Sequence, residues 1–364
     1  MSVRLAVIGT GHLGKIHAKL AKQHPDAELI AVCDPIREAR EAVAAEFQTS
    51  AVESHTELLG RIDAAIIATP TRFHYEVAAD LLRRGVHTFI EKPITLNTSD
   101  ADELIVIAER NRLALQVGHV ERFNPAFQAA LPHLGKPLFF DATRCGPYTC
   151  RSTDIGVVLD LMIHDLDLIL SLQPQNVQRI DALGMPVFGP NEDLAQARIT
   201  FADGAVANLQ ASRVSPTVQR TLTVYFETGY AAIDFQAKSV QVIRPTPKVV
   251  AGGVKVNELS SAERAHIKDN LFTEYLPLTS IAVDDCNAIL EEQRNFLGAV
   301  QGREQVRVTG RDGRRAVDAA ERILALLAEQ QTHLPAGWRH DHGHKPTGPH
   351  WSRVPAGTPL RKAG

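Results

Sequence analysis

An acid and a histidine in one apolar segment are the first candidates for chemistry. Asp160 and His164 lie four positions apart within 157–170, so a helix would project both from one face. Buried ionisable groups are costly unless they are paired, which favours a site where the carboxylate orients the imidazole. The alternatives are a helix-surface ion pair or a satisfied core histidine. Asp165 and Asp167 cannot converge with them on one ion, so we expect no metal.

A lysine directly after a strand-like run is the second candidate. Glu91-Lys92-Pro93 follows the apolar residues 86–90. The carboxyl ends of parallel strands face the cofactor crevice, so Lys92 is expected to emerge there, on a loop stiffened by Pro93. The alternative is a solvated surface lysine. Oxidation of a hydroxyl by hydride transfer needs a base for the proton and a cation for the developing alkoxide, which a lysine and a histidine can supply.

A glycine-rich loop indicates where a nucleotide cofactor binds. Gly9-Thr10-Gly11-His12-Leu13-Gly14 matches G-x-G-x-x-G, directly after a strand-like run and at the start of a helical one. The first glycine makes the turn, the second lets the backbone approach a pyrophosphate, and the third allows close helix–strand packing.

The acid that follows the second strand favours NAD over NADP. Asp34 stands about 20 residues after the loop, where a carboxylate accepts hydrogen bonds from the adenosine ribose and repels a 2′-phosphate. Arg37 is close enough to contact the cofactor as well. The alternative is a tight turn in which Asp34 only caps a helix.

Strands and helices alternate up to about residue 120, which predicts a doubly wound parallel sheet, a Rossmann domain over 1–120. The expected strands are 3–8, 27–33, 62–68, 86–90 and 113–117. The expected helices are 14–23, 37–47, 73–84 and 99–111, the last capped by Ser99 or Asp100.

In residues 121–331, several strand-like runs follow one another with tight turns between them. This pattern predicts an α+β domain with a mostly antiparallel open sheet. Expected strands are 138–144, 177–183, 195–201, 205–212, 220–226, 230–235 and 240–243. Expected helices are 125–133, 157–172, 283–301 and 311–330, with 245–279 irregular. The open face of such a sheet favours a partner subunit.

Composition excludes several classes of protein. The chain has 364 residues, a net charge of −3 and four cysteines, so neither nucleic-acid binding nor a disulfide scaffold is expected. No apolar run is long enough for a membrane span and no secretory signal is evident, which favours a cytoplasmic protein. Residues 332–364 hold five of the 15 histidines and no apolar periodicity, and we expect them to be disordered.

Several motifs together resemble the Gfo/Idh/MocA oxidoreductase family, over about residues 3–330. They are the glycine loop, Ala68-Thr69-Pro70-Thr71-Arg72-Phe73-His74, Glu91-Lys92-Pro93-Ile94, Gly118-His119-Val120-Glu121-Arg122-Phe123-Asn124-Pro125 and the Asp160–His164 segment. The resemblance implies that Lys92, Asp160 and His164 are catalytic. It places Thr69, Pro70, His74 and Glu91 near NAD, and implies a homodimer or homotetramer formed through the open sheet face.

A narrower resemblance covers Arg144-Cys145-Gly146-Pro147, Arg151, Asp154 and 156–165. It is similar to UDP-N-acetylglucosamine 3-dehydrogenases, which oxidise a sugar 3-hydroxyl to a ketone on a route to lipid A. The resemblance implies a nucleotide-sugar substrate bound between the domains. By position, the candidate substrate ligands are Arg122, Asn124, Arg144, Arg151 and Arg213, together with Asp160 and His164. Another sugar or cyclitol dehydrogenase, an NAD-using glycosidase and a non-catalytic NAD sensor are the alternatives.

Overall fold

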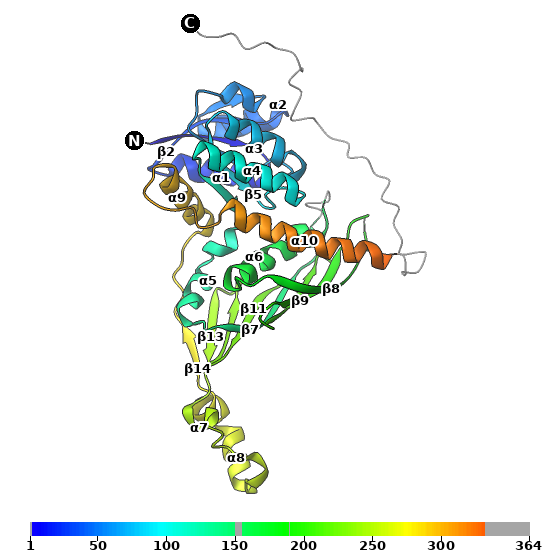
Figure 1. Cartoon of the computed structure of the whole chain (residues 1–364). Helices are drawn as coiled ribbons and strands as arrows, with labels where there is room; N and C mark the ends of the chain where they lie inside the picture. The colour runs from blue at the N-terminus through cyan, green and yellow to red at the C-terminus, as the bar shows by residue number, and fades with distance from the viewer. Residues whose placement is uncertain (1, 150–154, 189, 332–364) are drawn as a thin grey trace. The chain divides into compact units, whose positions relative to one another are not determined.

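A computed structural model describes residues 2–149, 155–188 and 190–331 (Figure 1). This part of the chain divides into two compact units. The first comprises residues 2–118 and 292–314, and the second residues 119–291 and 315–331. The predicted tail and the candidate Arg151 lie outside the described residues.

The first unit contains a six-stranded parallel sheet, which confirms the predicted fold class. In spatial order its strands are β3 (Ser50–Val52), β2 (Ala27–Cys33), β1 (Val3–Ile8), β4 (Ala64–Ile67), β5 (His87–Glu91) and β6 (Leu115–Gly118). The order reverses between β1 and β4, and ligands of open α/β sheets bind beyond the carboxyl ends of the strands at such a point. Strand β3 was not predicted, because three residues are too few to show an apolar pattern.

Four helices connect these strands. They are α1 (His12–Gln23), α2 (Arg37–Phe47), α3 (His74–Arg83) and α4 (Thr98–Asn111). The cap of α4 is Asn97, whose side chain accepts a hydrogen bond from Asp100 N, rather than Ser99 or Asp100 itself. A short polar run offers several possible caps, and the backbone path selects one of them.

Helix α9 (Ala288–Val300) supplies Phe296 and Leu297 to the core of the first unit. The ring centroids of Phe89 and Phe296 lie 5.8 Å apart. The predicted second domain included all of 121–331, so the place of 292–314 in the first unit differs from that expectation. Periodicity shows that a helix has an apolar face but not which sheet this face will cover.

The second unit contains an eight-stranded sheet, mostly antiparallel as predicted. Its order is β14 (Leu278–Ile281), β13 (Ser239–Ile243), β12 (Gly229–Asp234), β11 (Gln219–Phe226), β7 (Pro137–Cys145), β10 (Val206–Ser212), β9 (Leu194–Phe201) and β8 (Val177–Met185). Only β7 and β10 pair in parallel, because the chain returns to the sheet centre. Helices α5 (Pro125–Ala130) and α6 (Ile163–Leu172) pack against this sheet (Figure 1).

The segment expected to be irregular is partly helical. It contains α7 (Pro247–Val250), α8 (Ser261–Asp269) and a π-helical turn at Leu271–Tyr275. At the start of α8, Ser260 and Glu263 form a reciprocal capping box. That pair is visible in the sequence, but the helix has no buried residue and hence no apolar stripe to predict it.

The last helix, α10 (Gly310–Gln331), continues to the end of the described chain. Among the described residues, no helix has both the length and the hydropathy required to cross a bilayer.

Candidate functional site

The glycine loop connects β1 to α1 in the first unit. Gly9 has a φ of +98°, and a Cβ there would lie 2.5 Å from the Ala68 carbonyl oxygen. A Cβ on Gly14 would lie 1.8 Å from the Gly9 carbonyl oxygen. Both positions are therefore closed to side chains by backbone packing within the unit.

Gly11 is different, because it faces open space. No heavy atom lies within 4 Å of a Cβ built there. Gly11 is the N-cap of α1 and provides no side-chain cap, and the first turn of the helix has no acidic residue. The first N–H groups of a helix have no intrahelical acceptor, and the helix dipole makes this end attractive to anions. These features, with exposed His12 and Leu13, fit the pyrophosphate of a dinucleotide.

Asp34 follows β2 and is buried against the same loop. Its Oδ2 accepts hydrogen bonds from Thr10 N at 2.9 Å and Thr10 Oγ1 at 2.8 Å, and its Oδ1 accepts one from Ile36 N at 2.9 Å. Asp34 does not cap α2, the role weighed as an alternative: the N-cap of that helix is Ile36, which provides no side-chain cap, and the bond from Ile36 N forms in the turn before the helix. A carboxylate has about four acceptor sites, so three bonds from the chain leave capacity for a ribose hydroxyl.

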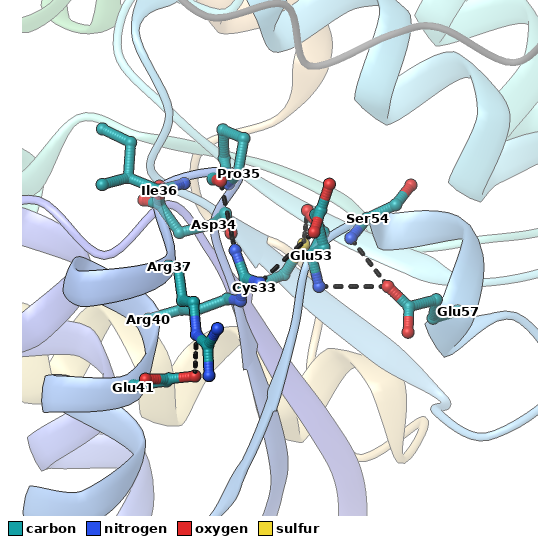
Figure 2. A network of polar contacts seen from close by, with 10 residues as sticks. All are labelled: Cys33, Asp34, Pro35, Ile36, Arg37, Arg40, Glu41, Glu53, Ser54 and Glu57. Carbon is teal, nitrogen blue, oxygen red and sulfur yellow. Dashed lines mark hydrogen bonds and ion pairs between the residues drawn. The ribbon is translucent and has the colours of Figure 1, made fainter.

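Figure 2 shows the polar network around Asp34. Arg40 donates to the carbonyl oxygens of Asp34 and Pro35 and pairs with Glu53 at 3.3 Å. Arg37, the other cation, pairs with Glu41 at 2.7 Å on the exposed side of α2. Both arginines near the ribose position already have acidic partners, which disfavours a 2′-phosphate and favours NAD.

A buried histidine joins the loops that follow β4 and β5. His74 Nδ1 lies 2.8 Å from the Pro93 carbonyl oxygen, and its Nε2 lies 2.9 Å from the Thr69 carbonyl oxygen. Burial lowers the pKa of His74, although both carbonyls favour the imidazolium. The ring therefore connects the Thr69–Pro70 segment to Pro93, the residue directly after Lys92.

Glu91 is positioned by a second histidine. His17 Nε2 lies 2.7 Å from Glu91 Oε1, and the Gln293 amide donates to His17 Nδ1 at 2.7 Å. Burial alone would raise the pKa of the Glu91 carboxyl, but His17 and Lys92 hold that pKa below its ordinary value. The buried carboxylate also accepts a bond from Lys92 N at 3.2 Å, which orders the backbone that carries the lysine.

In the second unit, the segment with Asp160 and His164 begins as a π-helix over Val158–Met162 and continues as α6. The prediction of one continuous α-helix over 157–172 is therefore wrong at its start. Wider π-helical turns are frequent at functional sites, and no side-chain period predicts them. Asp160 and His164 are partly exposed, whereas their apolar neighbours in this segment are mostly buried.

His119 was not predicted as a site residue. Its ring is buried, and its centroid lies 6.5 Å from that of His164 at an interplanar angle of 85°. Its position in Gly118-His119-Val120-Glu121 after β6 was visible, but the 44 intervening residues hide its contact with His164.

Arg144, one of the predicted substrate ligands, has partners within the protein. Arg144 donates to Asp165 at 2.8 and 3.0 Å and to Glu121 at 2.8 Å. Burial alone would lower the pKa of this guanidinium, but Asp165 and Glu121 raise it above its ordinary value. Arg144 is 4% exposed, so it binds these carboxylates rather than a ligand at the surface.

Two other candidate ligands also serve the fold. Arg122 pairs with Asp167 at 2.6 and 3.0 Å. Asn124 caps α5 by accepting a bond from Ala126 N, and it donates to Glu121 Oε2 at 2.9 Å. Sequence position alone could not reveal these partners, because the charged pairs join separate elements.

Two family models match this chain. The oxidoreductase family, NAD-binding Rossmann fold, matches residues 3–119, and the GFO/IDH/MocA C-terminal domain matches residues 133–232. The chain belongs to the Gfo/Idh/MocA family. This finding confirms the resemblance seen in the sequence, and with the fit of the Gly9–Gly14 loop it makes NAD the cofactor of this family member.

Two curated relatives and one solved structure extend the comparison. UDP-N-acetylglucosamine 3-dehydrogenase from Acidithiobacillus ferrooxidans is 35% identical over 89% of this chain and 97% of its own length. The scyllo-inositol 2-dehydrogenase (NAD(+)) from Bacillus subtilis is 32% identical over 59% of this chain and 68% of its own. A solved structure of UDP-N-acetylglucosamine 3-dehydrogenase from A. ferrooxidans has a TM-score of 0.79 at 33% identity, covering 90% and 99% of the two chains. This family member is an NAD-dependent oxidoreductase acting on CH–OH groups.

Proposed function

We propose that this protein oxidises the 3-hydroxyl of UDP-N-acetylglucosamine to a 3-keto sugar with reduction of NAD. The observation that carries the proposal is 35% identity to a UDP-N-acetylglucosamine 3-dehydrogenase over nearly the full length of both chains. In this reaction the hydroxyl loses a proton to a base and its carbon loses a hydride, so that a C=O bond forms. NAD, when bound, accepts the hydride and supplies the redox chemistry.

We propose Lys92, Asp160 and His164 as the catalytic group. His164 takes the hydroxyl proton on its imidazole, Asp160 orients the ring, and the Lys92 ammonium stabilises the developing alkoxide. The ordered backbone around Lys92 supports its role, because Glu91 and the His74–Pro93 contact hold the loop on both sides of it. The partial exposure of Asp160 and His164 in a largely buried segment supports theirs.

The deciding experiment is an assay of NADH formation with UDP-N-acetylglucosamine and analysis of the product for a 3-keto sugar. We expect both NADH and the ketone in equal amounts. NADH formation with a free cyclitol but not with the nucleotide sugar would instead favour an inositol dehydrogenase, the alternative supported by the relative from B. subtilis.

Replacement of the proposed base provides a sharper test. His164→Ala should lower kcat by about 10²- to 10⁴-fold, because a positioned acid–base group contributes about that much. NAD affinity should change little, since the glycine loop is in the other unit. Arg110→Gln, at an exposed position in the last turn of α4, is the control. Full activity of His164→Ala on the true substrate would refute its proposed role.

We further propose a cytoplasmic homodimer or homotetramer that supplies amino-sugar precursors of lipid A. The exposed face of the eight-stranded sheet supports self-association through polar contacts. This face carries Gln196, Arg198, Asn208 and Gln210, which hydrogen-bond in pairs across β9 and β10. Light scattering of the purified protein measures the oligomeric state.

A further inference from the structure

An aromatic pair of one exposed and one half-buried ring lies at one edge of the sheet in the second unit. Phe188 is 66% exposed, and its ring centroid lies 5.0 Å from that of Tyr148 at an interplanar angle of 43°. The Arg213 guanidinium lies over the Tyr148 ring, 5.2 Å from its centroid. The two rings are tilted relative to each other, and the exposed Phe188 ring offers a π face on which a flat ligand can stack.

The strand register brings this pair together. Cys145, Ser212, Leu194 and Met185 form one row across β7, β10, β9 and β8. Tyr148 lies three residues beyond the end of β7, and Phe188 three residues beyond the end of β8. Both rings are therefore on loops that leave the same edge of the sheet.

A buried ion pair holds the exposed ring in place. Asp193 Oδ2 accepts hydrogen bonds from Val187 N and Phe188 N, both at 2.6 Å. Asp193 is fully buried and pairs with Arg213 at 2.5 Å. Burial alone would raise the pKa of Asp193, but the hydrogen bonds from Phe188 N and Arg213 lower it, so the carboxylate stays charged. These bonds fix the backbone that carries the ring, so less conformational entropy is lost when a flat ligand stacks on Phe188 than on an unrestrained loop.

The same arginine ties this pair to the segment that carries the proposed base. Arg213 Nη1 donates to the Ile155 carbonyl oxygen at 3.0 Å, and Glu192 accepts from Val158 N at 3.0 Å. The π-helix begins at Val158, and His164 follows within the next two turns. His164 is six residues beyond Val158 and nine beyond Ile155. In a nucleotide sugar, a ribose and two phosphates separate the base from the sugar, so a base subsite at one end of this segment and a sugar subsite at His164 would suit one substrate.

We propose that Phe188 and Tyr148 form a stacking platform for the uracil base of the nucleotide-sugar substrate. The inference rests on the proposed function and adds a base subsite to it. One ring pair is far smaller than the ~800 Å² per partner that a stable protein interface buries, which favours a small planar ligand. Aromatic rings stack on nucleobases without a need for hydrogen-bond readout.

The test compares variants of Phe188 in the full-length protein, with UDP as the probe. Phe188→Ala should raise the dissociation constant of UDP and the KM for UDP-N-acetylglucosamine by about 5- to 100-fold, the range found for loss of one base stack. The kcat should stay within about twofold. Phe188→Trp should restore affinity, whereas Phe188→Leu, apolar but without a π face, should not.

Two controls show whether the loss of affinity is specific to the uracil base and to this ring. Phe272→Ala removes another exposed ring, 51% exposed and in the π-helical turn Leu271–Tyr275, and should leave UDP affinity unchanged. N-acetylglucosamine 1-phosphate has the sugar and one phosphate but no base, so its inhibition constant should be the same in wild type and Phe188→Ala.

Each outcome supports or overturns the inference. If wild type oxidises UDP-N-acetylglucosamine and Phe188→Ala has an unchanged KM, the platform is wrong and the proposed function stands. If wild type neither binds UDP nor oxidises the nucleotide sugar, both fail. If Phe188→Ala changes the oligomeric mass in light scattering while UDP affinity holds, the pair is a subunit contact and the inference is overturned.

Discussion

At the scale of single residues, the three glycines in the Gly9–Gly14 loop are glycines for different physical reasons. Gly9 and Gly14 face backbone atoms that a Cβ would overlap, so their requirement is internal packing. Gly11 meets no protein atom within 4 Å, so packing does not require a glycine there. The remaining reason for a glycine at Gly11 is the close approach of a ligand to the backbone.

This difference predicts opposite effects for two alanine variants. Gly11→Ala should unfold like wild type, because its φ of −66° suits alanine, yet its NAD dissociation constant should rise about tenfold or more. Gly14→Ala should destabilise the protein by about 1–3 kcal/mol through overpacking. Thermal unfolding and titration with NADH measure the two effects. Unchanged NAD affinity in Gly11→Ala would contradict the pyrophosphate cradle.

At the scale of elements, two arginines hold the segment with the proposed base. Arg144 from β7 binds Asp165, and Arg122 from the turn Val120–Phe123 binds Asp167. Both carboxylates are within three residues of His164 and are almost completely buried. Ion pairs at these depths fix the rotation of α6, and with it the direction in which His164 points.

Removal of one cation should show that this contact is structural. Arg144→Gln leaves the Asp165 carboxylate without its buried partner and should lower the free energy of unfolding by about 3–5 kcal/mol. The exposed control Arg110→Gln should change it by less than about 0.5 kcal/mol. Urea denaturation measures both. Wild-type stability of Arg144→Gln, with a raised KM for the nucleotide sugar, would instead indicate a phosphate ligand.

At the scale of the whole molecule, buried histidines of the first unit make the stability of the protein sensitive to acid. The first unit contains His55, His74 and His87, and burial lowers the pKa of each. Contacts that favour the protonated ring, such as that of His55 with Asp80 at 3.2 Å, do not reverse this lowering of the pKa. The folded state therefore binds fewer protons than the unfolded chain below the ordinary histidine pKa of about 6.5.

Stability should consequently fall as the pH drops. The contribution of these neutral histidines is fully present above about pH 6.5 and is lost as the pH falls toward their lowered folded pKa values. We expect the unfolding midpoint to decrease between pH 7 and 5. His55→Gln, which keeps a donor for Asp80, should show a shallower decrease. A midpoint that rises on acidification would contradict this assignment.

The sequence predicted features that depend on short stretches of chain. Each of these features can be recognised within a window of about 30 residues. They are the glycine loop, the acid after the second strand and each strand–helix–strand unit. Turn chemistry and apolar periodicity are local properties, so the Rossmann sheet and its cofactor loop could be predicted without coordinates. Seven of the eight described strands of the second sheet were predicted for the same reason, whereas β14 (Leu278–Ile281) was not.

Only the tertiary structure decided which partner each charged side chain finds. Arg144 and Asp165 are 21 residues apart, and Arg122 and Asp167 are 45 residues apart, so no local pattern could show that these arginines are internal. The π-helical start of the segment with the proposed base and the place of α9 in the first unit were hidden for a related reason. The spacing of apolar residues shows that a helix face must be buried, and a charged residue in an apolar segment shows that a partner is needed. Which surface or charge becomes the partner depends on contacts between segments far apart in the sequence.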